Sequence, residues 1–254
     1  IQCRIPYNCS NLHMKPVAIF RHTPTEGPGY FATFLEAHGV PWQLVAIDAG
    51  AQVPYAPENF SGLCLMGGPM SVNDPLPWID AVCDLVRKAV AADIPVIGHC
   101  LGGQLIAKAL GATVGASPNI EIGWWPMQTT DSAAARAWFG EFAGSTPTVI
   151  QWHYESFAVP AAAELIGSSD ACPQQAFAID TLLAMQFHVE IDAAKHALWL
   201  SASQRELARL PGEPYVQTAS VMAAQMANRL TESQKLADAI YSHFETLAKA
   251  ASGS

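Results

Sequence analysis

One stretch decides the expected fold, Val96-Ile97-Gly98-His99-Cys100-Leu101-Gly102-Gly103-Gln104, in which an apolar strand leads straight into a glycine-flanked cysteine. This pattern is typical of a nucleophile elbow, a sharp strand-to-helix turn that is strained and tolerates only small neighbours. Gly98 and Gly102 supply those small neighbours. The helix expected over 103–110, closed by Gly111, would direct the positive end of its dipole at the sulfur and favour the thiolate. An inert, buried cysteine in an apolar strand is the alternative.

A second apolar strand with a polar end is expected over Leu182-Leu183-Ala184-Met185-Gln186-Phe187-His188-Val189-Glu190. Residues two apart on a strand face the same side, so His188 and Glu190 should project together. The Glu190 carboxylate would then accept a hydrogen bond from His188 and orient its ring to take a proton from Cys100. A surface ion pair is the alternative, but beside the elbow the catalytic interpretation is favoured.

Paired glycines follow a third apolar run, in Met66-Gly67-Gly68-Pro69. Their backbone N–H groups, with the amide of Leu101, would form an oxyanion hole for a tetrahedral intermediate. An ordinary glycine turn is the alternative. His22 and Glu26, which follow the first expected strand, are placed at the rim of the same site.

In this order the three motifs resemble those of the class I glutamine amidotransferases, most of all the amidotransferase domain of GMP synthase and its free-standing relatives. The resemblance covers roughly residues 16–192. It implies hydrolysis of the glutamine side-chain amide through a γ-glutamyl thioester, with ammonia passed to an acceptor. It further implies a nucleophile, a base and an orienting acid at Cys100, His188 and Glu190, oxyanion amides at Gly68 and Leu101, and substrate contacts from Gly67 and Gln104.

The chain departs from the family pattern in two places. Val189 stands where the family usually has proline, and little effect is expected because the spacing is unchanged. His153-Tyr154-Glu155 occupies the place of a His-Gly-Asp segment that contacts the glutamine backbone in GMP synthase-like members. All three residues are candidates for substrate contact, although a structural loop is an equal alternative. Tyr154 in place of glycine would narrow the pocket or shift its specificity towards another γ-glutamyl amide.

Composition excludes several other classes. The net charge of −9 and the 13 scattered Lys and Arg residues argue against nucleic-acid binding. The sequence contains no run of about 18 apolar residues, the length that a membrane-spanning helix needs. Dispersed cysteines and an expected thiolate favour the cytoplasm. Neither a cofactor nor a metal is expected, because Cys3, Cys9 and His13 lack the spacing of a zinc site.

Alternating strands and helices predict an α/β fold with a mostly parallel central sheet and helices on both faces, flavodoxin-like as in the class I amidotransferases. The expected strands are 17–21, 43–47, 63–66 and 96–99, and the expected helices are 30–37 and 78–92. From residue 113 shorter strands predict a small antiparallel, meander-like layer beside this sheet, interrupted by a helix over 133–142.

Three segments are expected along the chain. Residues 1–13 are interpreted as a leader or an artificial extension, 14–200 as the amidotransferase domain, and 201–254 as a C-terminal helical extension packed on it. A helix is predicted over 192–210, capped by Asp192, and another from Thr218, with a fresh cap at Thr231-Glu232-Ser233. These C-terminal helices are candidates for contact with a second copy or with an acceptor enzyme.

The favoured function is therefore a glutaminase that acts on glutamine or a γ-glutamyl amide and delivers ammonia to a separate synthase. A stand-alone γ-glutamyl peptide or amide hydrolase with the same three residues is the second candidate. A dienelactone-hydrolase type of enzyme also uses a G-x-C-x-G elbow, but takes its acid and histidine from separate loops. A regulatory subunit without catalytic activity is the candidate from another class. The acceptor of the ammonia stays open at this point.

Overall fold

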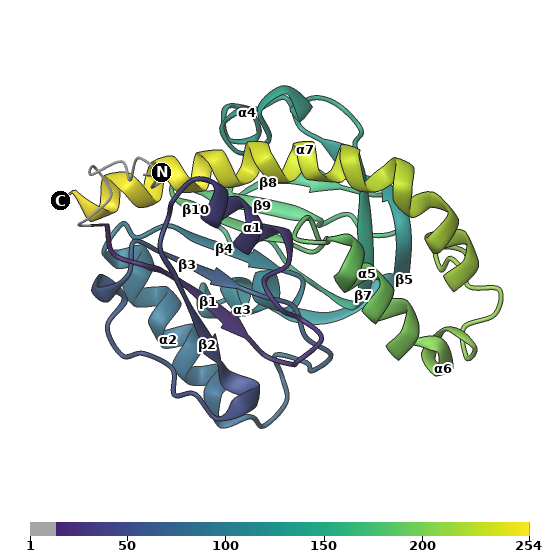
Figure 1. The fold of residues 1–254 in the computed structure, drawn as a ribbon, viewed down its shortest axis with the longest axis horizontal. Coiled ribbons are helices and arrows are strands. Elements are labelled where there is room, and N and C mark those ends of the chain that lie inside the picture. The colour runs from purple at the N-terminus through teal and green to yellow at the C-terminus, as the bar shows by residue number, and fades with distance from the viewer. Residues whose placement is uncertain (1–13, 254) are drawn as a thin grey trace, which may run out of the picture.

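An eight-stranded sheet forms the centre of the structure, a computed structural model that describes residues 14–253 (Figure 1). Its strand order is β2-β1-β3-β4-β10-β9-β8-β6. The first five are parallel neighbours: β2 (Trp42–Ala46), β1 (Val17–Arg21), β3 (Gly62–Leu65), β4 (Val96–His99) and β10 (Leu182–Met185). The remainder run antiparallel: β9 (Ala176–Ile179), β8 (Glu164–Ser168) and β6 (Gln128–Thr129).

Helices cover both faces of this sheet, as the alternating pattern predicted. One face packs against α1 (Tyr30–Ala37), α4 (Ala133–Phe139) and α7 (Ala219–Ser252), and the other against α2 (Pro77–Ala91) and α3 (Leu101–Ala109). Successive residues of the central strands serve opposite faces: Ile19 joins the first cluster and Phe20 the second. Strands buried on both sides explain the continuous apolar runs in the sequence. The α/β fold class is confirmed.

The antiparallel part differs in one respect from the prediction. Only β5 (Val114–Pro126) and β7 (Thr148–Phe157) form a separate two-stranded sheet. The other late strands extend the main sheet instead of lying beside it, because β10 joins β4 and its hairpin partner β9 continues the same edge. The predicted small antiparallel layer is therefore confirmed for β5 and β7, but the inclusion of the later strands in it is wrong.

The C-terminal helix also differs from the prediction. Thr218 caps α7 as expected, but no fresh cap forms at 231–233, and the helix is continuous for 34 residues. Ser233 is buried inside it. Met222 near its start packs into the cluster formed with β5 and β7, while Ile240 packs onto the central sheet. Packing at both ends favours one helix over the local capping preference.

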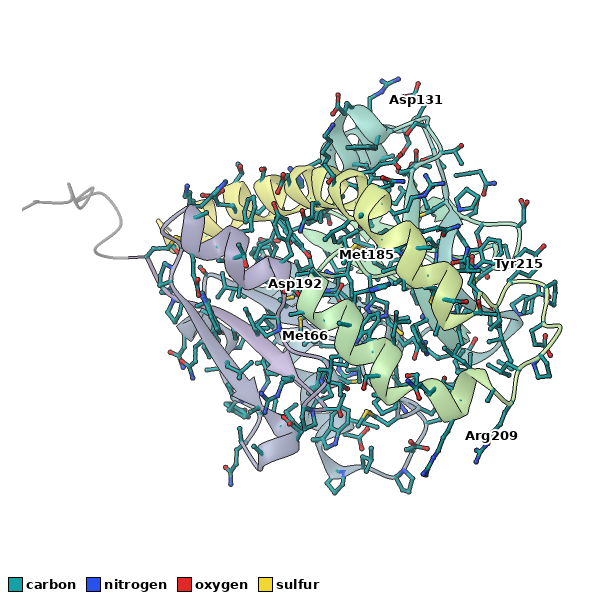
Figure 2. The ribbon with its side chains drawn as sticks, turned by 45° about the vertical axis from the view of Figure 1, so that its right-hand side comes forward. Met66, Asp131, Met185, Asp192, Arg209 and Tyr215 are labelled. Atoms are coloured by element: carbon teal, nitrogen blue, oxygen red, sulfur yellow. The ribbon has the colours of Figure 1, made fainter. Side chains whose placement is uncertain are left out.

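The segment between the sheet and α7 contains two short helices rather than one. Asp192 caps α5 (Ala193–Ala202) by accepting a hydrogen bond from the amide of Lys195, as predicted for this cap, and α6 (Gln204–Leu207) follows. Three 3₁₀ turns complete the elements: η2 (Ile47–Ala49), η3 (Pro57–Asn59) and η4 (Gly140–Phe142). In Figure 2, Met66 after β3, Met185 at the end of β10 and Asp192 before α5 mark the region where the site lies.

The leader predicted over 1–13, and with it Cys3, Cys9 and His13, lies outside the described residues. Within residues 14–253, no helix combines the length and apolar character needed to cross a membrane.

Candidate active site

Cys100 lies at the turn between β4 and α3, which begins directly after it. Its backbone has φ 50° and ψ −109°, a conformation that residues other than glycine rarely adopt. A Cβ on Gly98 would lie 2.4 Å from the carbonyl carbon of Gly102, and one on Gly102 would lie 2.0 Å from the carbonyl oxygen of Leu65. The strained turn and its two obligatory glycines are those of a nucleophile elbow.

His188 and Glu190 are paired deep in the fold, although β10 ends at Met185 and both residues lie beyond it. His188 Nδ1 is 2.6 Å from Glu190 Oε1. The His188 amide donates a hydrogen bond to the carbonyl of Ile150 on β7. This single bridge holds the backbone of His188 although the residue lies beyond the end of β10.

The charge state of His188 follows from its partners. Burial alone would lower its pKa, but the Glu190 carboxylate and hydrogen bonds with Cys100 and Glu190 outweigh burial and raise the pKa of His188 to about 10. The Glu190 carboxylate therefore favours the protonated imidazole, while the Cys100 sulfur lies 3.6 Å from the carbonyl oxygen of Trp152.

Lys195, which the sequence analysis missed, completes this cluster. Its ammonium group lies 2.8 Å from Glu190 Oε1, 3.2 Å from Glu26 Oε2 and 3.1 Å from the carbonyl oxygen of Gly27. Burial would raise the pKa of Glu190, yet Lys195 first, and then His188, hold it well below its usual range. The only local signal for Lys195 is its position three residues after the Asp192 cap, which carries no information about burial.

One further contact links the cluster to the C-terminal helix. His99 Nε2 lies 3.8 Å from Glu190 Oε2 and 3.2 Å from the hydroxyl of Tyr241 on α7. Burial lowers the pKa of His99 to about 4, so its ring is neutral.

Glu26, His188 and Glu190 also bring possible metal-ligand atoms within 4.8 Å of one another. The Lys195 ammonium already lies within ion-pair distance of the two carboxylates of this group.

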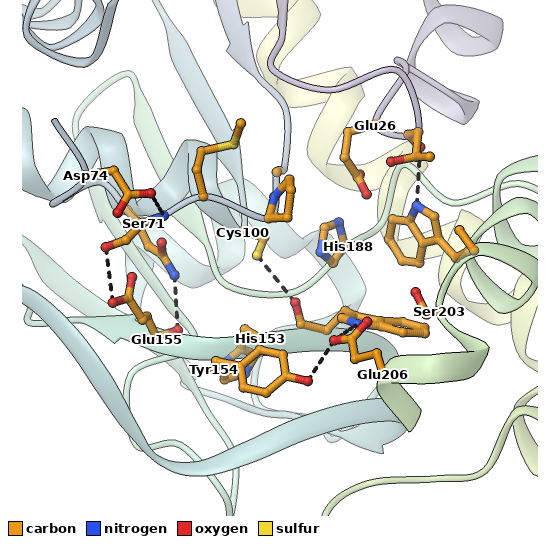
Figure 3. Close-up of a pocket in the computed structure, with 18 residues that line it drawn as sticks. Glu26, Ser71, Asp74, Cys100, His153, Tyr154, Glu155, His188, Ser203 and Glu206 are labelled. Atoms are coloured by element: carbon orange, nitrogen blue, oxygen red, sulfur yellow. Dashed lines mark hydrogen bonds between the residues drawn. The ribbon is translucent and has the colours of Figure 1, made fainter. Parts of the chain in front are cut away.

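A cavity of about 610 Å³ opens beside Cys100 and His188 (Figure 3). Gly68 lines it, and the Leu101 side chain lies 2.7 Å from the place of a Cβ on Gly68, so the two residues proposed for the oxyanion hole are neighbours. Gly67 packs behind them, because a Cβ there would lie 3.0 Å from Cε1 of His188.

One end of the cavity carries two of the predicted substrate contacts. Gln104 donates from Nε2 to the backbone carbonyl of Glu155 at 3.0 Å. The Glu155 carboxylate accepts a hydrogen bond from Ser71 at 3.1 Å. Gln186, which the sequence analysis did not single out, is 3.4 Å from Gln104 and places its Nε2 3.6 Å from the Cys100 sulfur.

His153 borders the cavity but directs its ring nitrogen elsewhere. Its Nε2 lies 3.1 Å from the buried carboxylate of Glu121, which also accepts hydrogen bonds from Gln175 and Ser169. The structure thus places His153 in a polar network behind the cavity wall, and its predicted substrate contact stays a prediction.

The opposite end of the cavity is aromatic. Tyr154 donates from its hydroxyl to Glu206 Oε1 at 2.7 Å, and Trp152 donates from Nε1 to the same oxygen at 3.2 Å (Figure 3). Trp199 packs edge-on against both His188 and Trp152, with ring centroids 4.7 and 5.7 Å away. Sequence analysis found neither Trp199 nor Glu206, because their places in the site depend on contacts with segments distant in the chain.

Comparison with known proteins agrees with this geometry. The model of the family "Glutamine amidotransferase class-I" matches residues 32–201. The chain belongs to the class I glutamine amidotransferases. The crystal structure of a glutamine amidotransferase from Methylobacillus flagellatus is 37% identical, covers 92% of this chain and 95% of its own, and superposes with a TM-score of 0.89.

Three curated relatives show the range of the family around this chain. The glutamine amidotransferase-like protein YfeJ of Salmonella typhimurium is 30% identical over 83% of this chain and 90% of its own length. The GMP synthase of Leifsonia xyli is 32% identical over 62% of this chain, which spans only 30% of that enzyme. Gamma-glutamyl peptidase 3 of Arabidopsis thaliana is 26% identical over 64% of this chain and 69% of its own length. The predicted resemblance to class I amidotransferases is confirmed.

Proposed function

We propose that this amidotransferase hydrolyses the side-chain amide of glutamine, or of a related γ-glutamyl compound, through a thioester on Cys100. The observation that carries the proposal is that the strained Cys100 lines one cavity together with His188, which is itself paired with Glu190 at 2.6 Å. An imidazolium beside the sulfur stabilises the thiolate, which is the form that attacks an acyl carbon.

The chemistry follows from these positions. The Cys100 sulfur bonds to the δ-carbon of the substrate, and the resulting oxyanion is stabilised by the amides of Gly68 and Leu101. His188 donates its proton to the departing nitrogen as the C–N bond breaks, which releases ammonia or an amine and leaves a γ-glutamyl thioester. Water then adds to the thioester while His188 takes one of its protons, and collapse of this second intermediate releases glutamate and restores the thiolate.

Glu190 keeps the His188 ring in one orientation throughout this cycle, and Lys195 keeps Glu190 ionised. Ammonia released at Cys100 would be used by a separate synthase, and the cytoplasm is the compartment that keeps such a thiol reduced. The C-terminal helices remain our proposed surface for contact with a synthase or a second copy. Within this chain, however, the apolar residues Ile240 and Phe244 of α7 are buried against its own sheet.

A stand-alone γ-glutamyl peptide or amide hydrolase is the second candidate. It is favoured by the cavity, whose volume of about 610 Å³ is in the range of sites for ligands much larger than glutamine. Tyr154, where the resemblance places glycine in GMP synthase-like members, lines this cavity.

The test is ammonia release from glutamine by the purified protein, beside Cys100→Ala and, as a matched control, Cys83→Ala. Cys83 is equally buried but lies on α2, away from the cavity. We expect turnover in the wild type and in Cys83→Ala, and none in Cys100→Ala with an unchanged fold by circular dichroism. Turnover that survives in Cys100→Ala would refute the mechanism, and a Cys100 thiol inert to alkylation would instead favour a regulatory subunit without catalytic activity.

A further inference from the structure

The cavity has two ends, and the proposed chemistry assigns a different part of the substrate to each. His188 must protonate the departing nitrogen, so the amine portion of the substrate lies on the His188 side of Cys100. The ring of Trp199 packs against His188, and Trp152, which packs against Trp199, donates a hydrogen bond to Glu206. The aromatic end therefore faces the leaving group, whereas Gln104 and Glu155 lie at the glutamyl end.

Ammonia as the leaving group would need almost no room at the aromatic end. Yet the cavity extends along α5 and α6 past Ala202 and Ser203 to Glu206. Ser203 and Glu206 also lie beyond residues 32–201, which the family model matches. This end of the cavity therefore combines aromatic residues from within the matched region with residues of the C-terminal segment.

The chemistry of the aromatic end is that of a cation site. Glu206 uses one oxygen, Oε1, for both of its hydrogen bonds, from Trp152 and Tyr154. Among the described residues no side chain bonds to its Oε2, and no lysine or arginine lines the cavity. Aromatic side chains beside a carboxylate favour an ammonium group through both charge and cation–π attraction.

We propose that this end binds the amine portion of γ-glutamyl amides that carry a second, cationic amino group, the γ-glutamyl diamines, with Glu206 as the residue that determines the specificity. The inference rests on the proposed function. Hydrolysis would break the amide C–N bond, add the hydroxyl of water to the acyl carbon and its proton to the nitrogen, and yield glutamate and a diamine. A γ-glutamyl peptide carries a carboxylate in its leaving group, which Glu206 would repel.

Binding to the Cys100→Ala protein tests the site without requiring turnover. The probes are γ-glutamyl-1,4-diaminobutane and γ-glutamylpentylamine, which has a methyl group in place of the terminal ammonium. By calorimetry we expect the cationic probe to bind at least about tenfold more tightly, as for a charged hydrogen bond in a partly buried site. Equal affinities would overturn the proposal, whatever the protein's activity.

Glu206→Gln provides the second measurement, because glutamine keeps the oxygen that accepts from Trp152 and Tyr154 but loses the charge. On the Cys100→Ala background it should abolish the preference for the cationic probe. Glu213→Gln, just beyond α6 and exposed, removes the same charge outside the cavity and should leave the preference intact. A preference that survives Glu206→Gln would overturn the role of Glu206.

Turnover separates this inference from the function on which it rests. In the wild-type background, Glu206→Gln should raise KM for the diamine substrate much more than KM for glutamine, whereas Glu213→Gln, outside the cavity, should change neither. Hydrolysis of glutamine without any preference among the amides would refute the cation site and leave the glutaminase intact. Absence of all hydrolysis with selective binding of the cationic probe would refute the glutaminase and leave the site.

Discussion

Replacement of Gly102 by alanine tests the elbow directly. The new Cβ would lie 2.0 Å from the Leu65 carbonyl oxygen and 2.6 Å from its carbon, whereas real Cβ atoms essentially never come within 3.0 Å of such atoms. The start of α3 must therefore move away from β3 by at least about 1 Å, and Cys100 moves with it. A displacement of this size can lower an enzyme's rate roughly 100-fold.

Gly102→Ala should lower the free energy of unfolding, although helix propensity alone predicts that it would raise it. Alanine in place of a helical glycine normally stabilises by about 1 kcal/mol, but overpacking against backbone costs up to about 3 kcal/mol. We therefore expect Gly102→Ala to lose about 2 kcal/mol of unfolding free energy in urea and most of its ammonia-releasing activity. Gly115→Ala is the control, since a Cβ there meets nothing within 4 Å. A Gly102→Ala protein as stable and active as the wild type would refute the close packing of α3 on β3.

Three further predictions concern the charges and thiols of the site. Lys195→Met removes a buried cation, so we expect the free energy of unfolding in urea to fall by about 3–5 kcal/mol. Because the pKa of Glu190 then rises, the acid limb of the activity profile should move to higher pH. Iodoacetamide at neutral pH should modify Cys100 well before Cys83, whose pKa burial raises to about 11; peptide mass spectrometry that finds both equally labelled would contradict this. Because the pKa of His188 rises from 6.5 to about 10 on folding, its stabilisation is complete below pH 6.5 and is lost as the pH rises through 10; this slope should disappear in His188→Gln.

The parts of the structure that sequence could predict are those specified locally. Glycines two residues to either side of Cys100 are needed by the turn itself, and the buried parallel strands are visible as apolar runs of the right length. The pairing of His188 with Glu190 was also predictable, although the reasoning assumed a strand that in fact ends at Met185. The bridge to Ile150 keeps the two side chains together where the strand does not.

Features that depend on distant segments escaped prediction. Lys195 is a charged residue on a helix, and sequence pattern alone favours an exposed position for it. It is buried because α5 packs over the loop that contains Glu26 and Gly27, and only that packing brings its ammonium to Glu190. The continuity of α7 has the same origin, since the two clusters that hold it are assembled from strands distant in the sequence.

The C-terminal segment therefore contributes to the site from two sides. Tyr241 of α7 contacts His99, which in turn lies next to the Glu190 carboxylate. Glu206 of α6 accepts hydrogen bonds from Trp152 and Tyr154 at the aromatic end of the cavity. Tyr241 and Glu206 lie beyond the region that the family model matches. The reaction that we propose at Cys100 needs neither Tyr241 nor Glu206, so these two residues are free to adjust the site around it. A charge on the leaving-group side can select among amides without altering the groups that cleave them, and this is the role that we assign to Glu206.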